Sequence, residues 1–465
     1  MSRSLVFFFM FFIAIVGLLS CRKESFTNST TAHLRTDADS LHFDTVFTTA
    51  GSTSQVIKLF NDNKEGIHIS SVRLGGGATS PFKINVDGLP GPNVSNVDLA
   101  GNDSLYIFVT VSINPNAASL AFVVTDSIAI SYNGNTKWVQ LDAYGQNAHF
   151  FRNRVVHGNE TWNNDLPYVI LGGLAVDTNA HLTINSGVRI YMHADAPFVV
   201  NGSLQVNGQK WDSTRVVFTG DRLDVPYRDF PASFPGLIFT DVSQNNVLNY
   251  AIVKNAYQGI VVSDPSPATK LTLNETIIDN AYDIGLFASN TSVNATNLLV
   301  SNCGKDIIIT NGGSYNFTHC TGAAYSNAYI QHKQPVLSVS NTPSTATAPN
   351  PLSANFRNCI FWGENNGILH DEVIVSKEGT TSFNVSFDGV LWRVQTAPSN
   401  ANITGAINNQ DPSFDSVNTN TRYYSFRLKD DSPAKDHGTN TSTPIDLDGN
   451  QRPVGLPDLG AYEKQ

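Results

Sequence analysis

The chain has 465 residues, more than one ordinary hydrophobic core accommodates, so we expect several domains or an elongated repeat. Apolar residues make up 41% of it, which is enough for packed cores, whereas charged residues make up only 15%. With 34 glycines and 21 prolines, this composition favours strands and turns over helical bundles. A net charge of −10 argues against nucleic acid as a partner, because phosphate binding requires a concentrated positive surface.

Residues 1–20 have the pattern of a signal peptide. Arg3 precedes the apolar run Leu5–Leu19, which is short of the roughly 20 residues that a membrane-spanning helix needs. The sequence Leu18-Leu19-Ser20-Cys21 resembles a bacterial lipoprotein signal. This resemblance implies that lipid on Cys21 anchors the protein to a membrane of the cell envelope, which we expect to be the Gram-negative outer membrane. A plain secretory signal is the alternative. Residues 21–32 are expected to form a flexible tether.

Residues 33–147 are predicted to form an immunoglobulin-like β-sandwich, because short alternating apolar runs recur there with turn residues between them. The expected strands are Leu41–Phe47, Gln55–Phe60, Ile67–Leu74, Phe82–Val86, Ser104–Ile113, Ser127–Tyr132 and Trp138–Ala143. The segments Phe43–Thr48, Lys58–Asn61 and Ile69–Leu74 resemble exported bacterial immunoglobulin-like domains. The resemblance implies a spacer or binding module rather than an enzyme.

Residues 152–465 are predicted to form a right-handed single-stranded parallel β-helix. Leu248–Asn255 aligns with Leu273–Asn280, and Asn297–Asn302 aligns with their second half, so the period is in the low twenties. A leucine-rich repeat has a similar period but needs Leu at fixed positions. The closing segment Ser432–Glu463 resembles that of exported bacterial β-helix proteins of the pectate-lyase-like kind. This resemblance implies the fold and the location of the protein. We expect the closing segment to cap the coil.

The repeat predicts which residues stack from coil to coil. Three asparagines are expected at one corner, because Asn tolerates a left-handed backbone and stacked amides hydrogen-bond between coils: Asn255, Asn280 and Asn302. An internal ladder is expected from Ile252, Ile277 and Leu299. Their neighbours are expected to face outward: Val253, Ile278 and Val300.

The densest group of charges lies in a loop expected to protrude from the coil. Its candidate ligand-binding residues are Asp221, Arg222, Asp224, Tyr227, Arg228 and Asp229. Arginine pairs with carboxylates and aromatic rings cover sugar faces, so this loop suits an acidic sugar. A loop whose charges pair among themselves is the alternative.

A second candidate is an outward stripe on one strand, formed by Arg189, Tyr191 and His193. A solvated surface is its alternative. No cofactor and no metal site is expected, since Cys and His lack metal spacing and the Asp446–Asn450 loop lacks the later ligands of a calcium loop. No catalytic residue is predicted.

Two functions fit these features. The preferred one is a non-catalytic envelope lipoprotein whose β-helix presents a binding or structural surface to polysaccharide or to another envelope protein. The alternative is a carbohydrate-active enzyme, a polysaccharide lyase or glycoside hydrolase, that acts on acidic polysaccharide with the 221–229 loop. We prefer the first because the charged residues do not converge on one repeated face, and a fold alone supplies no reaction.

Overall fold

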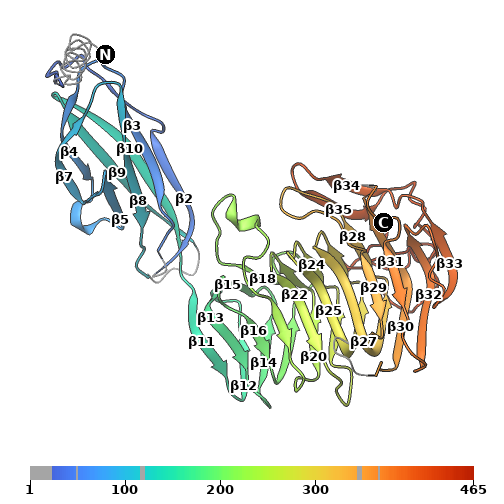
Figure 1. Ribbon diagram of the computed structural model, residues 1–465. Helices are drawn as coiled ribbons and strands as arrows, with labels where there is room; N and C mark the ends of the chain where they lie inside the picture. The colour runs from blue at the N-terminus through green and yellow to red at the C-terminus, as the bar shows by residue number, and fades with distance from the viewer. Residues whose placement is uncertain (1–23, 49–50, 116–120, 343–347, 365–366) are drawn as a thin grey trace, which may run out of the picture. The chain divides into compact units, whose positions relative to one another are not determined.

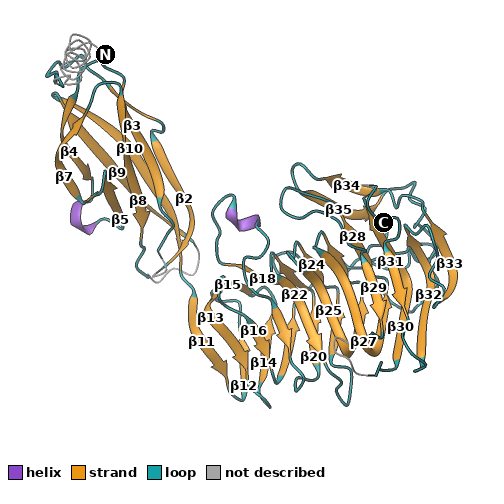
Figure 2. Ribbon diagram, in the orientation of Figure 1, coloured by secondary structure: helices purple, strands orange, loops and turns teal. Residues whose placement is uncertain are grey.

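A computed structural model of the chain describes residues 24–48, 51–115, 121–342, 348–364 and 367–465 (Figure 1). Its regular structure is almost entirely β-strand (Figure 2); among these residues the helical elements are two 3-10 turns, η1 (Gly77–Thr79) and η2 (Tyr227–Asp229). None of the described residues form a helix with the length and apolarity that a membrane crossing requires. The chain divides into two compact units between Asn147 and Ala148. The predicted signal peptide and Cys21 lie outside the described residues.

The first unit is a sandwich of two five-stranded sheets. One sheet has the order β1 (Leu34–Thr36), β3 (Gln55–Asn61), β8 (Asp103–Val111), β5 (Phe82–Val86) and β6 (Leu89–Pro90). The other has the order β2 (Ser40–Phe47), β10 (Asn135–Gln146), β9 (Phe122–Tyr132), β4 (Ile67–Leu74) and β7 (Asn93–Leu99). Strands β2 and β10 pair in parallel, and the other pairs are antiparallel.

Alternating side chains fill the core of this sandwich. Ile57 and Leu59 on β3 pack with Ile107 and Val109 on β8, and all four are fully buried. The seven predicted strands are all present. Strands β1, β6 and β7 were not predicted. Each lies at a sheet edge, and in β7 the polar side chains of the sequence NVSNVDL face solvent.

Part of the predicted flexible tether, residues 25–27, contacts the sandwich. Thr27 donates a backbone hydrogen bond to Gly66 at 2.9 Å, and Gly66 donates one to Ser25 at 2.7 Å. The ring of Phe26 stacks on His68 with centroids 4.1 Å apart. An aromatic ring that finds a partner offsets the entropy lost in ordering the backbone around it.

The second unit is a parallel β-helix, which confirms the predicted fold class. One continuous sheet runs from β11 (His149–Val156) to β33 (Asn402–Asn408), and its strands pair in parallel. Strand β13 (Tyr168–Val176) pairs with β15 (Arg189–Met192) through its first half and with β16 (Phe198–Val200) through its second. Each coil therefore contributes strands to three stacked faces.

The first face contains β15 (Arg189–Met192), β18 (Val216–Gly220), β21 (Ala251–Lys254), β24 (Ile277–Asp279), β26 (Leu299–Ser301) and β28 (Thr321–Ala324). The second contains β16 (Phe198–Val200), β19 (Leu237–Phe239), β22 (Gln258–Ser263), β29 (Leu337–Ser340) and β31 (Val373–Ser376). The third contains β12 (Asn159–Trp162), β14 (His181–Asn185), β17 (Ser203–Asn207), β20 (Asn246–Asn249) and β23 (Leu271–Asn274).

Four longer strands bend around a corner and serve two faces each. They are β25 (Ile284–Thr296), β27 (Lys305–Thr318), β30 (Leu352–Gly363) and β32 (Phe383–Trp392).

The interior of the first face is a ladder of buried residues in strict register. Its members are Tyr168, Ile190, Phe218, Val253, Ile278, Val300, Gly322, Phe361 and Trp392. Val253, Ile278 and Val300, which we predicted to face outward, therefore point into the coil. The alignment of Ile252 with Ile277 and Leu299 is correct, but these residues face outward.

The outward positions of the first face are apolar because the closing segment of the chain, Ser432–Glu463, covers part of them. Leu447, Leu459 and Tyr462 pack on the outward side chains of the first face, including those of Leu299 and Leu391. The buried guanidinium of Arg215 donates to the carbonyl of Leu447 at 2.5 Å. The segment therefore lies along the flank of several coils, whereas we expected it to cap the end.

Candidate functional site

The three predicted corner asparagines align from coil to coil, but the amide of Asn302 donates to Asp279 at 3.4 Å and not to Asn280. Asn255, Asn280 and Asn302 have φ values of 66°, 56° and 52°, in the left-handed region that Asn tolerates. The amide of Asn280 donates to the side-chain oxygen of Asn255 at 2.9 Å. The amides of Asn255 and Asn280 also donate to the backbone carbonyls of Arg228 and Asp229, at 2.8 and 3.1 Å. The ladder therefore holds the predicted binding loop against the coil.

Two insertions and a hairpin turn meet above this corner. The 221–236 loop protrudes from the coil, and a hairpin of β34 (Phe414–Asn418) and β35 (Tyr423–Leu428) lies farther along the same unit (Figure 1). Arg422, in the hairpin turn, donates to the carbonyl of Asp229 at 2.9 Å and lies 3.5 Å from its carboxylate. Tyr329, from the 325–336 insertion, lies under the Arg422 guanidinium at 4.6 Å and contacts the ring of Phe230, with centroids 4.7 Å apart.

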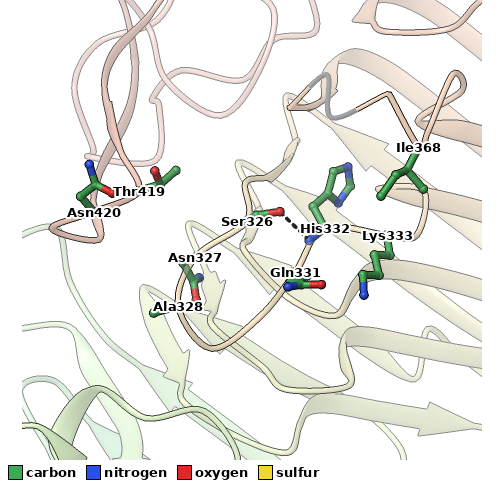
Figure 3. Close-up of a pocket in the computed structure, with 9 residues that line it drawn as sticks. All are labelled: Ser326, Asn327, Ala328, Gln331, His332, Lys333, Ile368, Thr419 and Asn420. Carbon is green, nitrogen blue, oxygen red and sulfur yellow. Dashed lines mark hydrogen bonds between the residues drawn. The ribbon is translucent and has the colours of Figure 1, made fainter.

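Two adjoining cavities, here called the corner cleft, lie beneath these contacts. The smaller, of about 150 Å³, is lined by Asp229, Lys254, Asn255, Asp279, Asn280, Asn302, Asn327, Thr421, Arg422 and Tyr424. The larger, of about 510 Å³, is lined by Ser326–Ala328, Gln331–Lys333, Ile368, Thr419 and Asn420 (Figure 3). Asn327 lines both. Only the larger cavity falls within the roughly 300–1,000 Å³ of ordinary small-molecule sites.

The floor of the smaller cavity carries an opposed pair of charges. Lys254 and Asp279 occupy equivalent positions on adjacent strands β21 and β24. Ser301, one coil further, donates its hydroxyl to Asp279 at 2.7 Å. Burial raises the pKa of Asp279, and its bonds with Ser301 and Asn302 and the charge of Lys254 oppose that rise.

A buried ionic cluster lies behind the larger cavity. His332 approaches both carboxylate oxygens of Glu372, at 2.9 and 3.0 Å, and Arg393 donates to one of them at 2.6 Å. The backbone of His332 donates to the hydroxyl of Ser326 at 3.0 Å, as Figure 3 shows. These bonds fix the insertion that forms the wall of the cleft.

The predicted binding loop pairs mostly with itself, as its alternative interpretation expected. Arg222 forms a bidentate pair with Asp224, with both bonds at 2.7 Å, and lies 4.0 Å over the ring of Tyr227. This pairing lowers the pKa of Asp224 and raises that of Arg222. Arg228 lies 3.7 Å from Asp229. Of the six predicted loop residues, Asp229 alone lines the corner cleft.

The predicted outward stripe is only partly joined to this loop. His193 lies 2.7 Å from the carboxylate of Asp221, whose pKa is raised by burial against the opposing effect of His193. Arg189 instead donates to the carbonyls of Arg215 and Asp212, at 2.6 and 2.7 Å. Tyr191 is half-buried, and burial raises its pKa. The nine predicted residues therefore do not form one cleft.

Sequence reasoning missed most of the residues that line the cleft. Lys254 and Asp279 each precede a corner asparagine by one residue, so a correct inward and outward assignment would have placed both on the surface. The hairpin turn carried no comparable signal. In the part of the chain that the structure describes, no group of three or more His, Cys, Asp or Glu is arranged to hold a metal ion.

These features define the class of protein: a β-sandwich followed by a parallel β-helix that carries a polar cleft on one corner. No protein-family model matches the sequence. No curated protein matches it either.

Three solved structures show limited similarity. Pectate lyase Pel9A is 12% identical over 69% of this chain and 88% of its own, with a TM-score of 0.35. A family 123 glycoside hydrolase from Clostridium perfringens is 11% identical over 24% of this chain and 25% of its own, with a TM-score of 0.19. A protein of unknown function from Porphyromonas gingivalis is 9% identical over 27% of this chain and 50% of its own, with a TM-score of 0.19. The fold assignment rests on the strand pairing described above.

Proposed function

We propose that this protein is a lipid-anchored component of the bacterial cell envelope that binds acidic polysaccharide in the corner cleft without cleaving it. The observation that carries the proposal is the chemistry of the cleft wall. Amides of Asn327, Gln331 and Asn420 suit sugar hydroxyls, and the ammonium of Lys333 suits a carboxylate or sulfate.

The charges around the cleft support binding more than catalysis. Of the carboxylates that line the cleft, Asp229 is engaged by Arg422, and Asp279 accepts a hydrogen bond from Ser301. A carboxylate that is already paired is a poor proton acceptor for a bound sugar. The bonds of Arg422 with Asp229 and of His332 with Glu372 nevertheless hold the hairpin turn and the insertion that carry these amides, which suits recognition of a polymer.

Binding is tested by affinity electrophoresis of the purified protein in gels that contain polygalacturonate or neutral dextran. The double variant Lys333→Gln/Asn420→Ala is expected to lose at least fivefold in affinity for polygalacturonate. The matched control is Lys377→Gln, an exposed lysine that does not line the cleft. Equal retardation of the two variants would contradict the proposed site.

Membrane anchoring is tested separately by growth of the source bacterium with radiolabelled palmitate. The wild-type protein is expected to incorporate label and to fractionate with the outer membrane. The Cys21→Ser variant is expected to do neither. Label in the Cys21→Ser protein would show that the acyl group is attached elsewhere and would refute this part of the proposal.

A polysaccharide lyase is the second candidate function. It is favoured by one observation: Lys254 lines the smaller cavity beside Asp279, and a lyase needs a basic side chain of this kind in its site. Incubation with polygalacturonate or alginate, followed by absorbance of unsaturated ends, tests it. Product formation that is lost in Lys254→Ala would replace the non-catalytic proposal with this one.

A further inference from the structure

The β-sandwich carries a second surface with the chemistry of a glycan site. It lies on the outward side of the sheet that contains β1, β3, β8 and β5. Three basic residues and three aromatic residues project there, and we call them the aromatic-basic face: Arg35, Lys58, Phe60, Lys83, Tyr106 and Phe108.

The strand register makes these side chains one continuous patch. Arg35 pairs with Phe60 across β1 and β3, and Lys58 pairs with Tyr106 across β3 and β8. Phe108 follows Tyr106 on the same side of β8, and the two ring centroids are 6.3 Å apart. Tyr106 and Phe108 are 46% and 42% exposed, whereas their neighbours Leu105 and Ile107 are in the core.

The positive charges lie among the rings. The Arg35 guanidinium is 4.1 Å from the centroid of Phe60, and the Lys58 ammonium is 5.0 Å from Phe60 and 5.3 Å from Tyr106. Arg35 is also paired with exposed Asp62 at 3.0 Å. Within the described residues, no ion pair involves the ammonium of Lys58 or Lys83, although the carboxylate of Asp37 accepts the backbone N–H of Lys58 at 2.9 Å. Two cations are therefore available to a ligand, in a chain whose net charge is −10.

We propose that the aromatic-basic face is a second site for acidic polysaccharide, independent of the corner cleft. Exposed rings cover the apolar faces of sugars, and Lys58 and Lys83 pair with carboxylate or sulfate groups on the same chain. Four neighbouring strands, each about 4.8 Å from the next, make the face long enough for more than one sugar. Nucleic acid is disfavoured, because its higher charge density meets more repulsion from an acidic protein.

Two double variants of the purified full chain test the face. Tyr106→Thr/Phe108→Thr removes the rings with β-favouring residues, and Lys58→Gln/Lys83→Gln removes the charges. We expect the first to weaken binding to polygalacturonate at least tenfold, and the second to weaken it at least fivefold and to reduce its salt dependence. Trp138→Thr is the matched control, since Trp138 is 46% exposed on the other sheet.

Each variant is also made in the Lys333→Gln background, so that the face and the cleft are separated. The face substitutions are expected to reduce affinity by the same factor in both backgrounds, even if Lys333→Gln alone has no effect. The single variants Tyr106→Thr and Lys58→Gln replace any double variant whose unfolding midpoint falls. The proposal is overturned if the face variants bind like Trp138→Thr, or if single-stranded DNA retards the wild type more than polygalacturonate does.

Discussion

Asn280 donates its side-chain amide to Asn255 one coil away, at 2.9 Å, while its own backbone is held at a φ of 56°. The same amide also reaches the carbonyl of Asp229 at 3.1 Å. One residue thus satisfies a turn, a contact between coils and the attachment of the loop that borders the corner cleft. The corner is therefore both a structural element and the floor of the candidate site.

Two substitutions separate these roles. Asn280→Gly keeps the left-handed backbone but removes the two hydrogen bonds, each worth about 1 kcal/mol. Asn280→Ala removes the same bonds, but unlike glycine, alanine has a Cβ, which disfavours this left-handed backbone by roughly 1–2 kcal/mol. We therefore expect the Ala variant to have the lower free energy of unfolding in urea, by about 1 kcal/mol. Equal values for the two variants would show that backbone strain at the corner is unimportant.

The buried ladder of the first face is expected to contribute strongly to the free energy of unfolding. Trp392 is fully buried and closes the stack above Phe361. Trp392→Ala leaves a large cavity among rigid strands, so we expect it to lower the free energy of unfolding by about 3–5 kcal/mol. Trp211, which is 66% exposed, supplies the control. Trp211→Ala is expected to change that free energy by less than about 0.5 kcal/mol.

The coil-to-coil alignment was predictable because residue type repeats along the axis. The spacing of Asn255, Asn280 and Asn302 therefore indicated both the fold and its register. The side of the strand facing inward was not predictable in the same way. Ile277 and Ile278 are both apolar, and the outward Ile277 packs against a cluster that includes the closing segment, so alternation carried no information.

The candidate site was less predictable, for a similar reason. Charge density drew attention to the 221–229 loop, but its arginines and aspartates pair within it. The cleft depends on Arg422, which is 193 residues from its partner Asp229 in the sequence. Contacts between distant insertions have no periodic signature, whereas contacts between coils do.

We expect the protein to lose stability in acid because of His319. Burial, with Arg452 and Arg357 nearby, lowers its pKa from 6.5 to about 2. Below pH 6.5 the unfolded chain gains a proton at this residue and the folded chain does not, so stability is lost as pH falls. The loss approaches about 1.4 kcal/mol per pH unit well below pH 6.5, and it amounts to about 1.6 kcal/mol between pH 6.5 and 5.

His319→Gln is expected to reduce the difference between the free energies of unfolding at pH 6.5 and pH 5 by that amount. Urea titrations at the two pH values measure it. His157, in an exposed pair with Asp177, is the control position. If His319→Gln leaves the difference as large as His157→Gln does, the acid sensitivity of the protein has another origin.

The contact of Arg422 with Asp229 is expected to hold the 221–236 loop in place. Both side chains are partly exposed, so Arg422→Gln is expected to lower the free energy of unfolding by less than about 1 kcal/mol. Its local effect is expected to be larger, because Arg422 is bound to the Asp229 carbonyl and lies over Tyr329. Hydrogen exchange measured by mass spectrometry should show faster exchange in residues 227–236 and in 326–333. Arg228→Gln is the control, since Arg228 contacts Asp229 from within the same loop. Faster exchange in Arg228→Gln than in Arg422→Gln would mean that the loop is held by its own charges and not by the hairpin.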